Sequence, residues 1–263
     1  MGKNKLRKFK ELEGNPLVLQ YPFGVVRESG FPLKGRWHED FFHNSNPIVL
    51  ELGCGKGEYT VGLGRRFAGK NFIGIDIKGA RIWAGATAAM RQEMTNVAFL
   101  RTSIELLEYF FAPGEVAEIW ITFPDPQMKK VNKRLTGTRF MEMYRRILAP
   151  GGVVHLKTDS PFLYAYTGMM ARHNGLEILT DTPDLYAVLP EDDPILNIRT
   201  HYEQQWLDRG LTIKYFAFRP GTEPSLQEPP EAADIAFDTY RSYSRGYIEC
   251  PQMLDDSDAE ADD

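Results

Sequence analysis

An acidic residue and three glycines stand together in the run Ile48–Gly57, which reads Ile-Val-Leu-Glu-Leu-Gly-Cys-Gly-Lys-Gly. Glycines that follow an apolar stretch permit a tight turn in which backbone N–H groups approach a ligand. Glu58 stands where the dinucleotide-binding fingerprint requires a small residue, so a pyrophosphate is disfavoured there. Glu51, just before the turn at Gly53 and Gly55, is instead a good neighbour for an ammonium group. An ordinary strand-to-helix turn is the alternative.

A second acidic residue, Asp76, ends the next apolar run, 19 residues beyond Gly57. A carboxylate at this place can accept hydrogen bonds from both hydroxyls of a ribose. The alternative for Asp76 is the N-cap of the following helix. Together, Glu51 before the glycines and Asp76 after the second strand fit the amino-acid end and the ribose of S-adenosylmethionine. This arrangement resembles that of a class I methyltransferase.

A third acidic residue, Asp125, stands between two prolines in the sequence Phe123-Pro124-Asp125-Pro126. The prolines keep the chain extended and stiff, which holds Asp125 at the carboxyl edge of the predicted sheet, where the sites of open parallel sheets lie. Four cations follow within residues 129–134. They form either a solvated helix face or a patch that contacts phosphates, and their closeness to the predicted methyl donor favours the patch.

The elements that must position these residues alternate between strands and helices, which predicts a buried, mainly parallel sheet with helices on both faces. The expected fold is α/β and Rossmann-like, with seven strands. Residues 1–46 are expected to form a basic N-terminal arm with a short helix around Arg36–His43, residues 47–220 the methyltransferase domain, and residues 221–263 an acidic, partly disordered extension with one helix at Asp234–Arg245. The expected strands are Ile48–Leu52, Asn71–Ile77, Val97–Leu100, Glu118–Phe123, Val153–Lys157, Leu176–Thr180 and Ile213–Phe218, and the expected helices between them are Glu58–Phe67, Ala80–Met94, Ile104–Phe111 and Gly137–Leu148.

Charge is divided unevenly along the 263 residues, whose formal net charge is −5. Residues 222–263 carry 2 basic and 12 acidic side chains, so the remainder of the chain is mildly basic and compatible with a nucleic-acid partner. We hypothesise that the acidic end competes with RNA for the basic surface. The 2 cysteines lie far apart, which disfavours a disulfide framework or a zinc site. No apolar run reaches the roughly 18 residues of a membrane helix, so a cytoplasmic protein is expected.

Five stretches in collinear order resemble the tRNA (guanine-N7)-methyltransferase family, the TrmB type of bacteria. The two most specific are the last two. In chain order, the stretches are the lead-in of Trp37 and Phe41 with Pro47, Leu50–Gly57, Phe123-Pro124-Asp125-Pro126 with Lys129-Lys130, Leu156-Lys157-Thr158-Asp159, and Thr200-His201-Tyr202-Glu203.

The resemblance implies transfer of a methyl group from S-adenosylmethionine to N7 of a tRNA guanine, guanine 46 of the variable loop, with S-adenosylhomocysteine as the other product. The sequence departs from the family pattern in two places. One is Gln127-Met128, and the other is Ser103, where the family usually has an Asp or Asn near the adenine. The implied cofactor-binding residues are Glu51, Gly53, Gly55, Asp76, Ser103 and Asp125, and the implied contacts with the tRNA guanosine are Lys129, Asp159, Thr200, Tyr202 and Glu203.

Methyl transfer to guanine N7 is an in-line displacement in which the protein supplies orientation and electrostatics. N7 has a free lone pair at neutral pH, so no strong general base is needed. We expect Asp125 to be the catalytic residue, because a carboxylate stabilises the cationic guanine that forms. Asp159 and Glu203 are expected to accept hydrogen bonds from guanine N1–H and the exocyclic amine. The alternative for Asp159 is a helix cap, and the alternative for Glu203 is an exposed acid at a helix start. The basic residues expected to bind tRNA are Lys3, Lys5, Arg7, Lys8, Lys10 and the 129–134 run. For the five N-terminal residues, a solubilising segment is an equally good explanation.

Other functions remain open at this point. A class I methyltransferase acting on another RNA, a small molecule or a protein explains Glu51, the glycines and Asp76 equally well, but not the cations or the Thr-x-Tyr-Glu stretch. A non-enzymatic RNA-binding protein would be expected to lack the cofactor acids. A nicotinamide oxidoreductase is disfavoured by Glu58. We expect no metal ion and no obligatory protein partner, and the sequence is compatible with a monomer or a homodimer.

Overall fold

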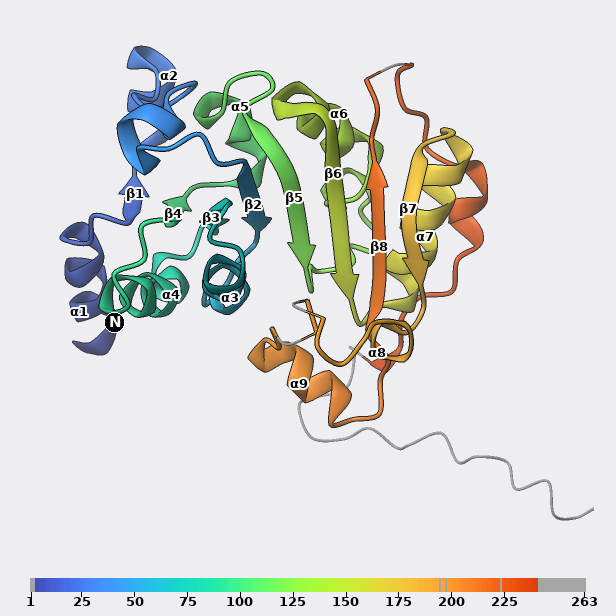
Figure 1. The fold of residues 1–263 in the computed structure, drawn as a ribbon. Coiled ribbons are helices and arrows are strands. Elements are labelled where there is room, and N and C mark those ends of the chain that lie inside the picture. The colour runs from blue at the N-terminus through green and yellow to red at the C-terminus, as the bar shows by residue number, and fades with distance from the viewer. Residues whose placement is uncertain (1–2, 194, 197, 223, 241–263) are drawn as a thin grey trace, which may run out of the picture.

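The computed structural model describes residues 3–240 except 194, 197 and 223. Within this part, eight strands form one sheet in the order β1-β4-β3-β2-β5-β6-β8-β7 (Figure 1). The acidic end of the chain, expected to be partly disordered, lies outside the described residues, as do residues 241–245 of the helix expected at 234–245. In the described part of that range the helix expectation was wrong, because η4 (Pro230–Asp234) ends at Asp234 and residues 235–238 are not helical. The strands are β1 Val18–Gln20, β2 Ile48–Leu52, β3 Asn71–Ile75, β4 Val97–Arg101, β5 Val116–Thr122, β6 Leu148–Thr158, β7 Glu177–Thr182 and β8 Lys214–Arg219.

Strands β1 to β6 pair in parallel, and β8 runs antiparallel to both β6 and β7. The expected strand count of seven was therefore wrong, because β1 adds an eighth strand at the edge beside β4. β1 has three half-buried residues between Pro16 and Pro22, so it is too short to show an alternating pattern. The strand order reverses between β2 and β5, which opens a crevice at their carboxyl ends.

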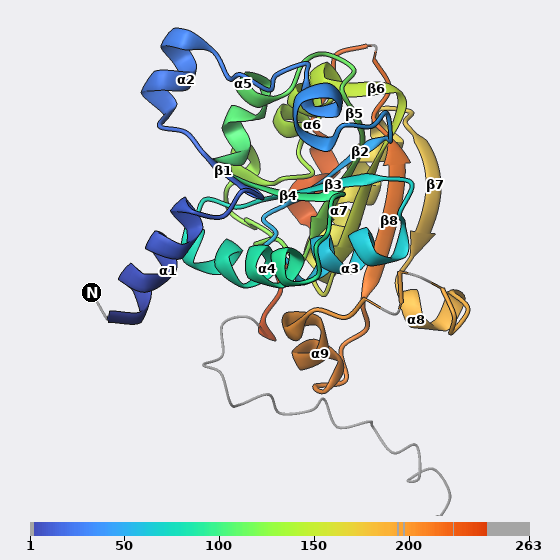
Figure 2. The same ribbon diagram turned by 60° about the vertical axis from the view of Figure 1, so that its left-hand side comes forward.

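Two helical layers cover the sheet, with α3 and α4 on one face and α6 and α7 on the other (Figure 2). Alternate residues of β2 serve the two layers: Leu50 packs toward α6 and α7, and Val49 toward α3 and α4. Burial on both faces explains why the central strands are uninterrupted apolar runs. The helices are α1 Lys3–Glu13, α2 Phe23–Ser29, the π-helix η1 Trp37–Phe42, α3 Glu58–Arg66, α4 Gly79–Arg91, the 3₁₀ helix η2 Ile104–Leu106, α5 Leu107–Phe110, the 3₁₀ helix η3 Val131–Lys133, α6 Thr138–Ile147, α7 Pro161–His173, α8 Leu185–Val188, α9 His201–Leu207 and the 3₁₀ helix η4 Pro230–Asp234.

The N-terminal segment, expected to be a basic arm, packs on the sheet domain. Helix α1 lies against α4, where Leu12 is buried and the indole N–H of Trp83 donates to Glu11 at 2.6 Å. The Lys8 ammonium lies 4.4 Å from the centre of the Trp83 ring. The short helix expected around Arg36–His43 is the π-helix η1, which buries Trp37 completely. The described part of this segment is therefore structured in the absence of RNA.

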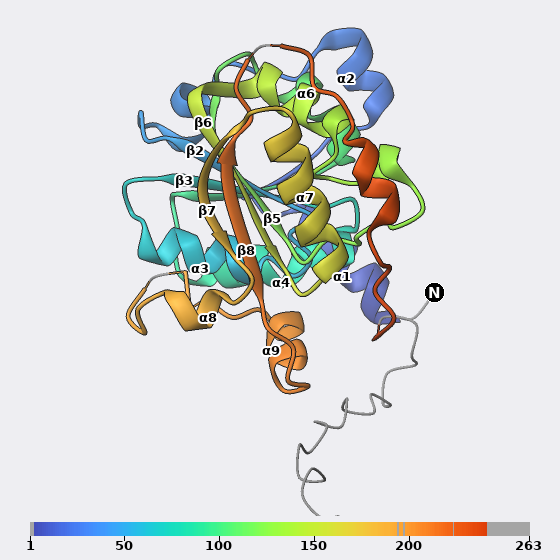
Figure 3. The ribbon, with the colours of Figure 1, turned by 90° about the vertical axis from the view of Figure 1, so that its right-hand side faces the viewer.

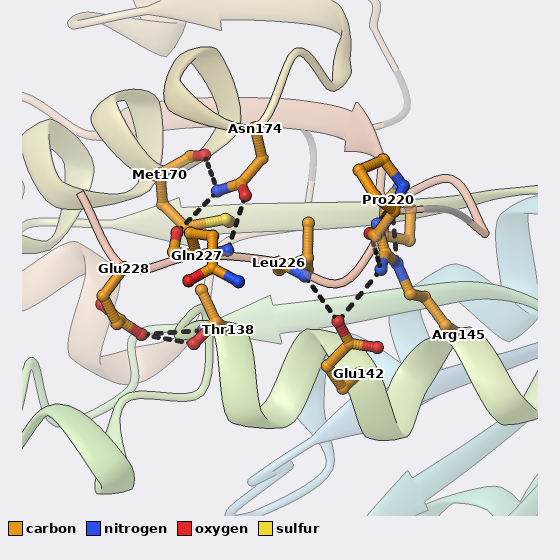
Figure 4. A network of polar contacts seen from close by, with 10 residues as sticks. Thr138, Glu142, Arg145, Met170, Asn174, Pro220, Leu226, Gln227 and Glu228 are labelled. Carbon is orange, nitrogen blue, oxygen red and sulfur yellow. Dashed lines mark hydrogen bonds and ion pairs between the residues drawn. The ribbon is translucent and has the colours of Figure 1, made fainter.

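Residues 220–240, which we call the C-terminal strap, run back across α6 and α7 (Figures 3 and 4). The Arg145 guanidinium of α6, with a side chain 5% exposed, donates to the carbonyl oxygens of Pro220 and Pro224. Glu142 accepts from the Leu226 N–H at 2.7 Å, and Asn174, the residue that follows α7, exchanges hydrogen bonds with Gln227 at 2.7 and 2.8 Å. The first half of the expected acidic extension thus packs as part of the domain.

Candidate functional site

The carboxyl ends of the central parallel strands form the edge at which the predicted site residues meet. Going along the sheet, Ser103 follows β4, Asp76 follows β3, Glu51 is the penultimate residue of β2, Asp125 follows β5, and Asp159 follows β6. Because β8 is antiparallel to β6, helix α9, which precedes β8, lies at the same edge (Figure 1). The fold therefore gathers residues from the whole length of the predicted domain at one edge.

Glu51 is held in place by three hydrogen bonds. Its carboxylate accepts the backbone N–H of Thr60 at 2.8 Å and the Thr60 hydroxyl, and on its other oxygen the Thr122 hydroxyl at 2.7 Å. Thr60 lies in the first turn of α3, so the carboxylate also stands at the positive end of that helix. Glu51 is only 3% exposed. Burial raises its pKa to about 7, although the hydrogen bonds from Thr60 and Thr122 act in the opposite direction.

Asp76 connects the glycine turn to the turn after β3. Its two carboxylate oxygens accept the N–H of Gly55 at 3.0 Å and the N–H of Lys78 at 2.7 Å. Gly53 and Gly55 adopt φ values of 73° and 56°, which glycine tolerates and other residues rarely do. The expected alternative for Asp76, capping of α4, is not what the structure shows, because the N-cap residue of that helix is Lys78.

Open space lies over the glycine turn. A Cβ added at Gly53 would meet no atom within 4 Å, and one at Gly55 would meet only the Gly53 carbonyl oxygen, at 3.9 Å. Beside this space stand two buried carboxylates from neighbouring strands, Glu51 and Asp76. This pair of acceptors fits S-adenosylmethionine, whose ammonium and ribose hydroxyls both donate hydrogen bonds.

The loop after β5 presents Asp125 to solvent at the crevice between β2 and β5. The Asp125 carboxylate accepts the Gln127 N–H at 3.0 Å. Phe123 and Gln127, on either side of it, both have φ values of 48°, an uncommon conformation for non-glycine residues that concentrates at functional sites. Buried Arg134 fastens the loop by donating to the carbonyl oxygens of Gln127 and Met128, the latter at 2.7 Å.

The basic run at 129–134 is divided between two roles. Arg134 is 4% exposed and stacks over the rings of Phe162 and Tyr166, so it is a structural residue. Lys133 pairs with Glu105 at 2.8 Å. Lys129 and Lys130 are exposed next to Asp125. Of the predicted phosphate-contacting patch, Lys129, Lys130 and Lys133 are therefore exposed and Arg134 is buried.

Glu203 is fully buried and belongs to an internal ion pair. One carboxylate oxygen accepts the Lys157 ammonium at 2.7 Å and the Tyr186 hydroxyl at 2.6 Å, and the other faces the Thr200 N–H at 3.3 Å. Thr200 and Glu203 form a capping box at the start of α9. The carboxylate is therefore not the exposed acid considered as an alternative. Lys157, to which the sequence assigned no function, anchors α9 to the sheet.

Three predicted site residues remain, of which Tyr202 and Asp159 were assigned to the substrate and Ser103 to the cofactor. Tyr202 on α9 is 43% exposed at the edge. Asp159 is buried and accepts the Tyr240 hydroxyl at 2.6 Å. Ser103 is half-buried after β4, and its hydroxyl does not cap the following helix η2. Sequence reasoning missed Tyr240, because it lies in the segment outside the family resemblance.

A groove of about 600 Å³ lies between α3 and α4 beside the glycine turn. Of the described residues that line it, four are basic and one, Glu58, is acidic; the basic ones are Lys56, Arg65, Arg66 and Arg199. Among the residues that the structure describes, no group of three His, Cys, Asp or Glu side chains could hold a metal ion. No helix in that part is long and apolar enough to cross a membrane.

Comparison with known proteins gives the same picture. A family model described as "Putative methyltransferase" matches residues 45–216. The tRNA (guanine-N(7)-)-methyltransferase of Porphyromonas gingivalis is 64% identical over 89% of this chain and 96% of the relative. The protein of the same name from Bacteroides fragilis is 58% identical over 93% of this chain and 96% of the relative.

Solved structures share the fold at low sequence identity. The 16S rRNA methyltransferase KamB is 13% identical and has a TM-score of 0.53, with 68% of this chain and 90% of that chain covered. An antibiotic-related methyltransferase is also 13% identical and has a TM-score of 0.52, with 78% and 96% covered. The expected class I methyltransferase fold is thereby confirmed. The glycine turn, the acids at the strand ends and the named relatives together show that the chain belongs to the tRNA (guanine-N7)-methyltransferase family.

Proposed function

We propose that this protein transfers the methyl group of S-adenosylmethionine to N7 of a guanine in tRNA, guanine 46 of the variable loop, to give 7-methylguanosine. The observation that carries the proposal is the 64% identity over 89% of the chain with a relative of that name. The gathering of Glu51, Asp76, Asp125 and Asp159 at one edge supports it. The proposal includes a cytoplasmic location, no metal ion and no obligatory protein partner.

S-adenosylmethionine supplies an electrophilic methyl group on a sulfonium. In this proposal Glu51 binds the ammonium of its amino-acid end, and Asp76 accepts from the ribose hydroxyls. The Asp76 carboxylate accepts hydrogen bonds from the backbone N–H groups of Gly55 and Lys78. Each carboxylate oxygen has a second lone pair that can accept from a ribose hydroxyl. Both acids are held by their own hydrogen bonds before the cofactor arrives, so little reorganisation is needed on binding.

Asp125 and Asp159 face the acceptor in this proposal. Guanine becomes cationic as the N7–carbon bond forms, and a carboxylate nearby stabilises that charge. We assign this role to Asp125, which the strained loop presents at the crevice. Asp159 accepts from guanine N1–H and the exocyclic amine. No residue needs to remove a proton from N7, because its lone pair is free at neutral pH.

The ion pair of Glu203 with Lys157 supports a modified role for the Thr-x-Tyr-Glu stretch. Both oxygens of Glu203 are already engaged by groups of this chain, so we propose that Glu203 fixes α9. Tyr202, exposed on α9, is then the member of the stretch that contacts the guanosine, and Thr200 caps the N-terminus of α9.

The tRNA backbone needs cations at the same edge. Exposed Lys129 and Lys130 follow Asp125 directly. The basic groove between α3 and α4 offers a second set, and Arg199 joins that groove to α9. We propose that both sets contact phosphates.

The test is to incubate the protein with methyl-labelled S-adenosylmethionine and unmodified tRNA, and then to cleave the RNA at 7-methylguanosine. Scission at a single guanosine of the variable loop is the expected result. A matched tRNA with adenosine at that position should take up no label. Label in another base, or in another RNA but not in tRNA, would contradict the proposal and favour a class I methyltransferase with a different acceptor.

A further inference from the structure

The C-terminal strap ends at the carboxyl edge, next to the proposed acceptor residues. Asp238, 7% exposed, accepts the Ser160 hydroxyl and the Phe162 N–H, the latter at 3.0 Å, at the start of α7. Its own N–H points to the sulfur of Met128 at 3.1 Å, in the loop that carries Asp125. The strap is therefore fastened on both sides of the predicted guanine position.

Two residues further on, Tyr240 lies between β6 and α9. Its hydroxyl donates to Asp159 at 2.6 Å. Its ring meets Trp206 edge to face, with ring centres 5.4 Å apart. Trp206 stands one helical turn after Tyr202 on α9. Tyr240 thus joins the carboxylate proposed to read the guanine to the helix that carries the exposed tyrosine.

We propose that Tyr240 is a positioning residue for the acceptor guanine, and that the C-terminal strap is part of the substrate site. The inference rests on the proposed function and deepens it. The Tyr240 hydroxyl fixes the rotation of the Asp159 carboxylate, and each carboxylate oxygen has two lone pairs, so it can accept from tyrosine and from guanine together.

The strap itself explains how Tyr240 is delivered to this place. Upstream, Glu228 accepts the hydroxyl of Thr138 on α6 at 2.6 Å (Figure 4). Its other oxygen accepts the hydroxyl of Tyr166 on α7 at 2.7 Å. Phe237 packs edge to face on Phe162. A residue held by such a chain of contacts costs little conformational entropy when the substrate binds.

The test compares Tyr240→Phe with the full-length wild-type enzyme on tRNA that carries guanosine or inosine at the target position. Inosine lacks the exocyclic amine. We expect kcat/KM on guanosine to fall about tenfold in Tyr240→Phe, the order of effect of losing one hydrogen bond to a charged group. The preference of the enzyme for guanosine over inosine should fall with it, while the dissociation constant of S-adenosylmethionine stays unchanged.

Tyr164→Phe is the matched control, because the Tyr164 hydroxyl also donates to an aspartate, Asp181 of β7, which β8 separates from β6 and Asp159. It should change neither kcat/KM nor the preference. Equal losses on guanosine and inosine in Tyr240→Phe would show a merely structural effect and overturn the inference, as would unchanged kinetics. A rise in kcat/KM would also overturn it, since Tyr240 would then block the pocket. Wild-type enzyme that forms no 7-methylguanosine would refute the proposed function instead.

Discussion

Replacing Glu51 with glutamine should make the empty protein more stable at alkaline pH and a poorer binder of its cofactor. Glu51 is the buried acid beside the glycine turn, and burial raises its pKa to about 7 from an ordinary value of 4.5. Glutamine has the same shape and no charge. The side-chain oxygen of Gln can still accept from Thr60, and the hydroxyl of Thr122 can turn to accept from the new amide.

The size and the sign of the stability effect follow from the two pKa values. An acid with a raised folded-state pKa contributes stability that is fully present below its unfolded pKa, near 4.5, and is lost as the pH rises through about 7. The difference corresponds to about 3 kcal/mol of unfolding free energy. The free energy of unfolding of Glu51→Gln, relative to wild type, should therefore rise by about 3 kcal/mol between pH 4.5 and pH 8.5.

Two assays measure this effect. Urea unfolding of both proteins across that pH range gives the stability difference, and its change with pH removes any constant cost of the substitution. Calorimetric titration with S-adenosylmethionine in buffers of different ionisation enthalpy gives the proton count. Near pH 7 about half of the Glu51 side chains are protonated in the empty wild-type protein, so cofactor binding should release about half a proton that the variant does not release. Binding by Glu51→Gln should also be weaker, by about 10²-fold.

A stability difference that does not change with pH would refute the raised pKa of Glu51. Equal proton release by wild type and variant would refute its contact with the ammonium group. The two results are independent, so a raised pKa without proton release would leave Glu51 as a purely structural residue that fastens β2 to α3 and β5.

Three further predictions concern the ion pair, the loop and the RNA surface. Lys157→Met should lower the free energy of unfolding, measured in urea, by about 3–5 kcal/mol, because it removes the lysine partner of buried Glu203. The double variant with Glu203→Leu should recover much of this loss. Additive losses in the double variant would contradict the pairing. Asp125→Ala should lower kcat by about 10²-fold or more while the dissociation constant of S-adenosylmethionine changes little; unchanged turnover would remove Asp125 from the mechanism. Lys129→Ala should weaken tRNA binding and reduce the slope of log K against log salt by about 1. Lys133→Ala is the control, and it should change the slope less because Lys133 already pairs with Glu105. Equal slopes in the two variants would contradict a phosphate contact at Lys129.

The position of the proposed cofactor-binding residues in the fold could be predicted from sequence because its determinants are local. The glycine turn, Glu51 and Asp76 sit at fixed distances from two strongly apolar strands, and parallel strands bring their carboxyl ends to one edge. The order of the central strands and helices follows from the same alternation. Short, half-buried β1 was missed, because three residues carry no periodicity.

The acceptor side was decided by tertiary structure, because its contacts join residues far apart in the chain. Lys157 meets Glu203 and Tyr240 meets Asp159 across the edge. A sequence does not show which buried charge finds which partner, since the desolvation that makes pairing necessary exists only once the core has formed. The net charge of −5 likewise did not reveal that the first part of the acidic segment packs against α6 and α7 as the C-terminal strap. The sequence by itself determined which side chains are present and in what spacing; packing decided that Glu203 lies in a buried ion pair and that Asp125 is exposed at the edge of the sheet.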